Sequence, residues 1–254
     1  MHKFKKQYGQ NFLTDPNLLE AIADDAVVNK DDVIIEVGAG MGALTEVLAR
    51  RAKKVISFEI DADLESALRA LEKKYNNLQV IMGDFLNFDF SSLKIEKFKV
   101  VSNLPYYITT VIITKFLKLN PISMTLMVQK EVGLRLSASP KSSVYGAMSV
   151  ICQNQAKVTL TRIVKREMFT PAPEVDSALV RFDFFGNDYD EDFAKFVFEI
   201  FALKRKTLVN NLKKMIGQDK TQMVFDNFNL NPSVRAEELS PEEIYKIFTF
   251  VENM

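Results

Sequence analysis

Histidine and cysteine, on which much enzyme chemistry depends, are almost absent from this sequence. Its 254 residues include one histidine, His2, and one cysteine, Cys152. A single cysteine excludes an internal disulfide and a cysteine-based zinc site, and it is typical of a reducing compartment, so we expect a cytoplasmic protein. Because the histidine stands next to the amino terminus, catalysis or metal binding by histidine is disfavoured, and we expect no metal.

The sequence also lacks long apolar runs and an excess of charge of either sign. No apolar stretch approaches the roughly 18 residues that a membrane-spanning helix needs, and residues 1–6 lack the apolar core of a secretory signal. With 33 basic and 33 acidic residues the formal net charge is zero, whereas proteins that bind nucleic acid are usually basic. Any such contact must rely on local basic clusters, although most clusters of this kind are solvated faces. The candidates are Lys3/Lys5/Lys6, Arg50/Arg51/Lys53/Lys54, Lys204/Arg205/Lys206 and Lys213/Lys214.

Short apolar segments alternate with segments of helical periodicity over the first two thirds of the sequence. This alternation is typical of βαβ units and predicts an α/β fold with a mostly parallel sheet. The last two strand candidates are close enough in sequence to pair with each other, so an antiparallel last strand is expected. The predicted strands are 33–37, 55–60, 78–82, 98–101, 125–128, 158–164 and 177–184, with helical segments at 130–136 and 145–154.

From Tyr189 onward only helical periodicity remains. It fits segments 193–203, 207–216, 221–228 and 242–251, and Ser240-Pro241 supplies the last with an N-cap and a proline at the first helical position. Gly186-Asn187-Asp188 is the best candidate boundary. We therefore predict an α/β domain at 1–185 and a small all-helical domain at 186–254.

Residues suited to ligand binding stand at the ends of successive predicted strands. The first strand leads into Gly38-Ala39-Gly40-Met41-Gly42, whose glycines allow a tight turn and the close approach of a ligand. The second ends at Glu59, where a carboxylate can accept hydrogen bonds from both hydroxyls of a ribose. The third leads into Asp84, which can accept from an adenine amino group or cap the following helix. Because strand ends of a parallel sheet share one edge, we predict one cofactor pocket formed by Gly38, Glu59, Asp84 and Asn103.

The fourth of these strands is followed by Asn103-Leu104-Pro105-Tyr106, which indicates chemistry on an aromatic amine. The Asn103 oxygen and a backbone carbonyl, of Leu104 or Pro105, are two acceptors for the two N–H donors of an exocyclic amino group. The ring of Tyr106 offers a flat base a stacking surface. Taken alone, the same four residues also fit an ordinary strand-to-helix turn.

In combination, these motifs resemble those of class I S-adenosylmethionine-dependent N6-adenine methyltransferases. The remainder of the chain narrows the resemblance to the small-subunit ribosomal RNA adenine dimethyltransferases, the KsgA family. The further matching segments are Lys5–Leu13, Gln129–Val132, Tyr145–Val150, Phe169–Ala178, Lys204–Leu208 and Arg235–Leu239. The sequence departs from the family pattern at Ala39, Met41, Ser102, Tyr107, Thr170 and Ala172, none of which is a matched binding residue. The neutral net charge is a larger departure, and it concerns RNA affinity rather than the chemistry.

The resemblance implies a Rossmann-like catalytic domain at 1–185 and a helical RNA-recognition domain at 186–254. It implies that S-adenosylmethionine is the cofactor, with Asn11 and the Leu13 backbone contacting its methionine part. The target adenine leaves its stack and is expected between Tyr106 and Phe169, and Pro171 and Pro173 favour a surface loop over core packing for Phe169. The implied catalytic residues are Asn103, Leu104, Pro105, Tyr106 and Phe169.

The implied reaction is methylation of the N6 atoms of two adjacent adenines near the 3′ end of small-subunit ribosomal RNA. The substrate would be an immature ribosomal subunit, and the product N6,N6-dimethyladenine. The enzyme is expected to be a monomer.

Other interpretations stay open at this point. The erythromycin-resistance methyltransferases share the cofactor motifs and modify large-subunit RNA, although Tyr145-Gly146 and Lys204–Leu208 favour the small-subunit enzymes. A mitochondrial transcription-factor relative would carry a transit peptide, for which residues 1–6 give no sign. A ribosome-assembly factor without catalytic activity and an NAD-dependent oxidoreductase are the alternatives from other classes, and the second gives Asn103–Tyr106 no task.

Overall fold

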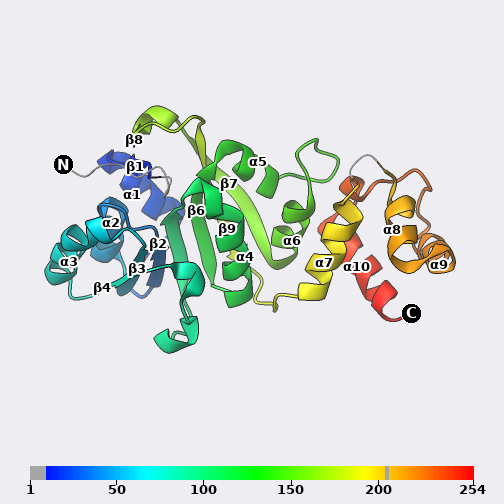
Figure 1. Ribbon diagram of the computed structural model, residues 1–254, viewed down its shortest axis with the longest axis horizontal. Helices are drawn as coiled ribbons and strands as arrows, with labels where there is room; N and C mark the ends of the chain where they lie inside the picture. Colours follow the sequence, from blue (N-terminus) through cyan, green and yellow to red (C-terminus); the bar gives the residue numbers. More distant parts are fainter. Residues whose placement is uncertain (1–9, 204–205) are drawn as a thin grey trace. The chain divides into compact units, whose positions relative to one another are not determined.

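One seven-stranded sheet dominates the part of the chain that the computed structural model describes, residues 10–203 and 206–254 (Figure 1). Its strands are β2 (Val33–Val37), β3 (Lys54–Glu59), β4 (Leu78–Met82), β5 (Lys99–Asn103), β6 (Ser123–Gln129), β7 (Ala156–Val164) and β9 (Ser177–Phe184), in the order β4-β3-β2-β5-β6-β9-β7. The pairs from β4 to β6 are parallel, and β9 is antiparallel to β6. The predicted α/β fold with an antiparallel last strand is therefore confirmed.

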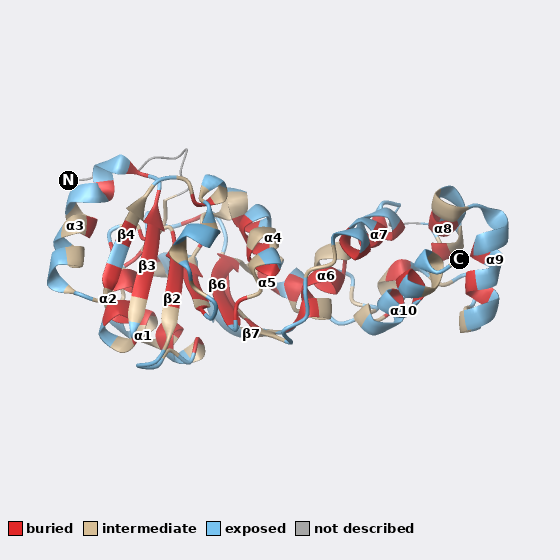
Figure 2. Ribbon diagram, turned by 90° about the horizontal axis from the view of Figure 1, so that it is seen from below, coloured by how far each residue is buried: buried red, intermediate tan, exposed pale blue. Residues whose placement is uncertain are grey.

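The central strands are apolar because both faces of the sheet are covered. Every residue of β3 except Lys54 is buried, as is every residue of β6 except Gln129 (Figure 2). Such continuous burial is typical of parallel strands with helices on both sides. The helices of this part are α1 (Pro16–Asp25), α2 (Ala43–Arg51), α3 (Glu65–Lys74) and α4 (Thr109–Leu119), and α5 (Lys130–Leu136) begins in it and continues past its last residue, Gly133.

Local sequence accounts for where the first helix begins. Asp15 has extended backbone and its carboxylate accepts a hydrogen bond from the Leu18 N–H at 2.9 Å, while Pro16 occupies the first helical position. Ahead of this cap, the short strand β1 (Phe12–Leu13) pairs antiparallel with β8 (Phe169–Thr170). This pairing carries residues 10–13 to the carboxyl edge of the large sheet.

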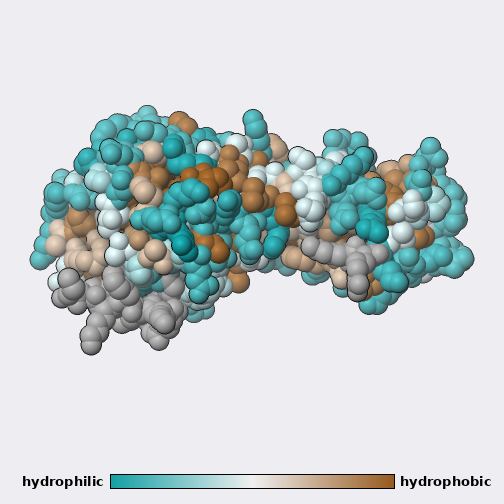
Figure 3. Space-filling view, turned by 90° about the horizontal axis from the view of Figure 1, so that it is seen from above, coloured by the Kyte–Doolittle hydropathy of each residue, from teal (hydrophilic) through white to brown (hydrophobic). Residues whose placement is uncertain are grey.

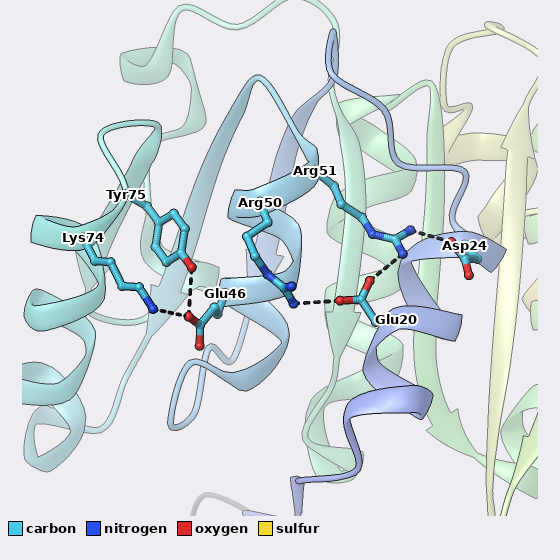
Figure 4. Close-up of polar contacts among 7 residues, drawn as sticks. All are labelled: Glu20, Asp24, Glu46, Arg50, Arg51, Lys74 and Tyr75. Atoms are coloured by element: carbon cyan, nitrogen blue, oxygen red, sulfur yellow. Dashed lines mark hydrogen bonds and ion pairs between the residues drawn. The ribbon is translucent and has the colours of Figure 1, made fainter.

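Exposed ion pairs connect the first three helices (Figure 4). The guanidinium of Arg51 contacts both Glu20 and Asp24 of α1, and Arg50 reaches Glu20 at 2.7 Å. On the other side of α2, Glu46 accepts from Lys74 at 2.7 Å and from the Tyr75 hydroxyl at 2.9 Å. Surface ion pairs contribute little individually, so this network adds little to the stability of the sheet unit.

The remaining helices form a separate unit made of residues 134–156 and 187–254. It contains α6 (Ala147–Gln155), α7 (Glu191–Phe201), α8 (Leu208–Ile216), α9 (Gln218–Phe228) and α10 (Pro241–Glu252), and α6 packs against α7 and α10. The buried Tyr145 hydroxyl donates to the Leu239 carbonyl at 3.1 Å. Burial also raises the pKa of the Cys152 thiol to about 12, so the single cysteine is chemically inert.

The boundary between the two units differs from the sequence-based expectation in one respect. The sheet unit consists of residues up to Gly133 and Lys157–Gly186, so the chain enters the helical unit before β7 and again after Gly186. The roles assigned to 1–185 and 186–254 stay predictions, and Lys204 and Arg205 lie outside the described residues. No helix in the described ranges is both long enough and apolar enough to cross a membrane.

Candidate functional site

A cavity of about 420 Å³ opens at the carboxyl ends of β2, β3, β4 and β5. Parallel pairing brings these ends to one edge of the sheet, which is where open α/β folds bind ligands. Nine of the ten predicted site residues line the cavity: Asn11, Leu13, Gly38, Glu59, Asp84, Asn103, Leu104, Pro105 and Tyr106. The tenth, Phe169, is not among its lining residues.

Glu59 holds the loop after β2 against the end of β3. Its carboxylate accepts from the Gly40 N–H at 2.8 Å and from the Asp61 N–H at 2.9 Å, and its side chain is almost fully buried. Gly40 has φ +59°, and a Cβ there would lie 2.8 Å from the ring of Phe12. A glycine is required at this position because both the backbone conformation and the space exclude a side chain.

Asn103 is anchored by its amide nitrogen, which donates to the Asn11 carbonyl at 3.0 Å. Among the described residues no donor contacts its Oδ1 atom, so this oxygen is available as an acceptor at the cavity. The bond also fixes residues 10–13 at the end of β5. On the other side of this segment, Gln10 donates to Asp61 at 2.7 Å.

The two carbonyls considered as the second acceptor differ in their partners. The Pro105 oxygen accepts from the Ile108 N–H at 3.3 Å and from the Thr109 hydroxyl at 3.2 Å. Within the described ranges the Leu104 oxygen accepts no hydrogen bond. The geometry therefore favours Leu104 over Pro105 as the available backbone acceptor.

Tyr106 forms one wall of the cavity at the start of the 3-10 helix η5 (Tyr106–Ile108). Its hydroxyl lies 2.6 Å from the hydroxyl of Ser177, the first residue of β9. Burial raises the pKa of Tyr106, and the phenol stays neutral at physiological pH. The side chain is thus fixed at its backbone, in η5, and at its hydroxyl, by Ser177.

Asp84 acts as a helix cap while it lines the cavity. Its carboxylate accepts from the Leu86 N–H at 2.9 Å and from the Asn87 amide at 2.7 Å, so the capping role considered from the sequence is present. The loop that follows is held by Lys115 of α4, whose ammonium donates to the carbonyls of Phe85, Leu86 and Phe88 at 2.7, 2.8 and 3.1 Å. Because lysine carries three N–H donors, these bonds use all of them.

Phe169 differs from the expectation of a surface loop. The side chain is 3% exposed and belongs to the apolar core beside Leu13, with which it pairs in the β1–β8 ladder. Pairing with β1 draws residue 169 inward even though prolines follow it. Thr170, the next residue, lines the cavity instead.

Glu36 is a cavity residue that the sequence analysis did not select. It is 1% exposed on β2, and its Oε2 atom accepts from the hydroxyls of Thr45 and Ser57, both at 2.6 Å. Burial raises the pKa of Glu36 from 4.5 to about 7, despite these two bonds. The available signal was an acidic residue inside an otherwise apolar strand, Val33–Val37.

Large apolar side chains remain exposed at the mouth of the cavity. Met41, Ile60 and Tyr107 line it and are each more than 40% exposed. Figure 3 shows that exposed apolar side chains lie among hydrophilic ones on one face of the molecule. Two of these three residues, Met41 and Tyr107, are positions at which the sequence departs from the family pattern.

A mostly parallel sheet of this order, with one antiparallel strand and a cavity at its carboxyl edge, defines a class I Rossmann-like methyltransferase. The structure is similar to that of a dimethyladenosine transferase from Plasmodium falciparum, with a TM-score of 0.84, 26% identity and coverage of 95% of this chain and 98% of that one. It is also similar to a 23S rRNA methyltransferase, ErmE, with a TM-score of 0.75, 25% identity and coverage of 95% and 100%.

The family model for ribosomal RNA adenine dimethylase matches residues 1–253, and the chain belongs to that family. It is 40% identical to the ribosomal RNA small subunit methyltransferase A of Clostridium botulinum (strain ATCC 19397 / Type A), covering 96% of this chain and 93% of that protein. It is 37% identical to the protein of the same name from Mycoplasma mycoides subsp. mycoides SC, covering 98% of each. The predicted family is confirmed, and an NAD-dependent oxidoreductase is excluded.

Replacing Glu36 with Gln is expected to remove a pH dependence of stability. Because the pKa of Glu36 is higher in the folded chain, the folded state holds this proton more tightly. The stabilisation is complete below about pH 4.5 and is lost as the pH rises to about 7, a change of about 3 kcal/mol. The difference in free energy of unfolding between the two proteins, measured by urea denaturation, should therefore change by this amount between pH 4.5 and 8. A constant difference would contradict the assignment.

Replacing Lys115 with Met is expected to loosen the loop at residues 84–90, because three carbonyls lose their donor. A polar group left without a partner costs about 1–3 kcal/mol. Hydrogen exchange of the amides in this loop should become faster, whereas exchange in β2 and β3 should not change. Lys118→Met, on the exposed side of the same helix, is the matched control. Equal exchange in the two variants would show that the Lys115 bonds do not hold the loop.

Proposed function

We propose that this protein transfers methyl groups from S-adenosylmethionine to the N6 atoms of two adjacent adenines near the 3′ end of small-subunit ribosomal RNA. Relatives that are 37–40% identical over nearly the whole chain carry the name ribosomal RNA small subunit methyltransferase A. The product would be N6,N6-dimethyladenine, formed on an immature subunit in the cytoplasm by a monomeric enzyme. One geometric observation carries the proposal: Asn103 is fixed through its nitrogen, so its oxygen is free to accept at the cavity.

The cavity residues fit S-adenosylmethionine. Glu59 has two carboxylate oxygens at the end of β3, each with one backbone donor and a remaining lone pair for a ribose hydroxyl. Asp84 and the apolar wall of Phe85 suit an adenine ring, and Asn11 and Leu13 border the side assigned to the methionine part. Gly38, with φ +81°, leaves the loop free of a side chain. When bound, the cofactor supplies an electrophilic methyl group on a sulfonium.

The residues of the chain orient the nucleophile. The lone pair of an aromatic amine is delocalised into the ring, and acceptors on both N–H bonds favour a more pyramidal nitrogen. The Asn103 oxygen and the Leu104 carbonyl are the two acceptors, and Tyr106, fixed by Ser177, provides a stacking surface for the base. Orientation of this kind is worth about 7–11 kcal/mol. After the first methylation one N–H remains, so the pocket must also accept a monomethyl amine with a single donor.

The role of Phe169 in this mechanism requires a local rearrangement. Its ring lies in the core, and the neighbouring Thr170 lines the cavity. For Phe169 to stack on the second face of the base, the β1–β8 ladder would have to open. We retain Phe169 as a proposed stacking residue on the basis of the family pattern alone.

The helical unit is proposed to recognise RNA. Its described basic residues include Lys206, Lys213 and Lys214, and Lys213 and Lys214 lie in the last turn of α8. A basic helix end facing RNA would compensate for the zero net charge of the chain. Lys204 and Arg205, which belong to the same basic cluster in the sequence, lie outside the described residues.

Incubation with labelled S-adenosylmethionine and under-methylated small ribosomal subunits tests the proposal, followed by mapping of the modified nucleotides. We expect label in two adjacent adenines near the 3′ end of the small-subunit RNA. Label in large-subunit RNA would instead indicate an activity like that of ErmE. Binding of the subunit without any label would indicate an assembly factor.

Replacing Asn103 with Ala is expected to abolish methyl transfer and to weaken cofactor binding to a smaller extent. The variant leaves one amine N–H without an acceptor, at a cost of about 1–3 kcal/mol, and it releases residues 10–13 from the end of β5. Mass spectrometry of digested RNA should find unmodified adenine, with monomethyladenine if the defect is partial. Calorimetry with S-adenosylmethionine is the parallel measurement. Full dimethylation by the variant would remove Asn103 from the mechanism.

Replacing Glu59 with Ala is expected to weaken S-adenosylmethionine binding, because a ribose hydroxyl would lose a charged acceptor worth about 1.5–3 kcal/mol. Calorimetry measures the affinity, and thermal unfolding reports whether the loop bonded through Gly40 still folds. Glu65→Ala, which removes an exposed carboxylate from α3, is the matched control. An affinity equal to that of the control would show that Glu59 does not bind the ribose.

A further inference from the structure

Three basic residues from two distant segments of the sequence lie around Asp176 at the carboxyl edge of the sheet, and two of them contact its carboxylate through their side chains. Lys165 and Lys130 place their ammonium groups 3.4 and 3.7 Å from the Asp176 carboxylate. Asp176 also accepts from the Arg166 N–H at 3.3 Å, and its own carbonyl accepts from the Lys130 N–H at 2.9 Å. None of the basic clusters visible in the sequence contains these three residues.

The cluster lies next to the wall of the cavity. Asp176 directly precedes Ser177, whose hydroxyl is 2.6 Å from that of Tyr106. Lys130 directly follows Gln129, the residue of β6 that pairs with Ser177. Asp176 and Lys130 are thus the sequence neighbours of two paired residues, and one of that pair, Ser177, contacts Tyr106, the proposed stacking residue for the base.

The three cations of the cluster outnumber the two carboxylates with which they form ion pairs. Two ammonium groups share Asp176. The guanidinium of Arg166 donates instead to the Glu174 carbonyl at 3.4 Å and pairs with Glu167 at 3.2 Å, which is the only further ion pair of the cluster in the described residues. Both members of that pair are more than half exposed, so the pair is weak and open to exchange. Glu131 and Glu174 are exposed on the same segments, and no ion pair joins them to the three cations in the described part of the chain.

We propose that Lys130, Lys165 and Arg166 form a binding site for the RNA phosphates that flank the target adenosine. This inference rests on the proposed function and adds to it the position of the backbone. A base that leaves its stack rotates about its own phosphates, so those phosphates stay beside the mouth of the pocket. The side chains of Lys130, Lys165 and Arg166 are 45%, 70% and 54% exposed, which leaves them accessible to a phosphate.

The salt dependence of subunit binding tests the site. The variant Lys130→Gln/Lys165→Gln/Arg166→Gln should lower the slope of log affinity against log salt by about 2–3, because each phosphate contact contributes 0.7–0.9. Between 50 and 200 mM salt, the unaltered protein should then lose roughly 20- to 40-fold more affinity than the variant. Cofactor affinity and the midpoint of thermal unfolding should stay unchanged.

A control with the same change in charge is available at the opposite edge of the sheet. Lys94 and Lys97 precede β5, Lys118 lies in the last turn of α4, and all three residues are exposed. The variant Lys94→Gln/Lys97→Gln/Lys118→Gln should keep the slope of the unaltered protein. If the triple variant of the cluster fails to fold, Lys165→Gln alone should lower the slope by about 0.7–0.9.

The outcomes separate this inference from the proposed function. If the cluster variant has the same slope as the control variant and the subunit is still methylated, the phosphate site is overturned and the proposed function stands. If the cluster variant instead loses cofactor affinity and thermal stability together, the three residues stabilise the loop at 165–176. That result would also overturn the phosphate site. Absence of methylation by the unaltered protein would overturn the proposed function, and the phosphate site with it.

Discussion

The carboxylate and carbonyl of Glu59 connect the loops that form the cavity. The side chain accepts hydrogen bonds from the N–H groups of Gly40 and Asp61, which lie just beyond the ends of β2 and β3. The main-chain oxygen of the same residue accepts from the Gly83 N–H at 2.7 Å, which places the loop after β4. Backbone donors at the sheet edge need partners, and here one acidic residue that lines the cavity accepts from three of them, two through its carboxylate and one through its carbonyl. The ligand site and the folding of the sheet edge therefore depend on the same group.

The fold and most of the cavity could be predicted because both follow from local sequence. Strands at 33–37, 78–82 and 177–184 appear with the predicted bounds, and Gly38, Glu59, Asp84 and Asn103 meet because parallel strands end at one edge. The missed features depend on contacts between distant segments. The sequence around Lys115 does not reveal that three carbonyls from residues 85–88 surround it, and the prolines after Phe169 gave no indication that pairing with β1 would bury its ring. The membership of 134–156 in the helical unit arises from packing against α7 and α10, about 40 to 100 residues later.

Several cavity residues serve the fold and the ligand together. Asp84 caps a 3-10 helix with the carboxylate that would accept from adenine, and Asn103 fixes the segment at 10–13 with the amide whose oxygen would accept from the target base. The alternatives that the sequence left open, a cap or a ligand for Asp84, are thus compatible. A carboxylate has about four lone-pair sites, so one side chain can serve both. A loss of activity in such a variant must be separated from a loss of structure, and a matched control variant serves that purpose.

The division of the helical unit between two chain segments bears on how the protein can be dissected. Residues 134–156 precede β7 in the sequence, but α6, whose buried residues include Val150, Ile151 and Cys152, packs against helices that are made only after Gly186. A fragment that stops at Gly186 would retain α6 and lose α7 and α10, leaving this apolar face in water, where such faces promote aggregation. During synthesis on the ribosome, α6 would likewise emerge well before its packing partners. An isolated fragment that keeps only the sheet unit would therefore need a linker in place of residues 134–156, joining Gly133 to Lys157.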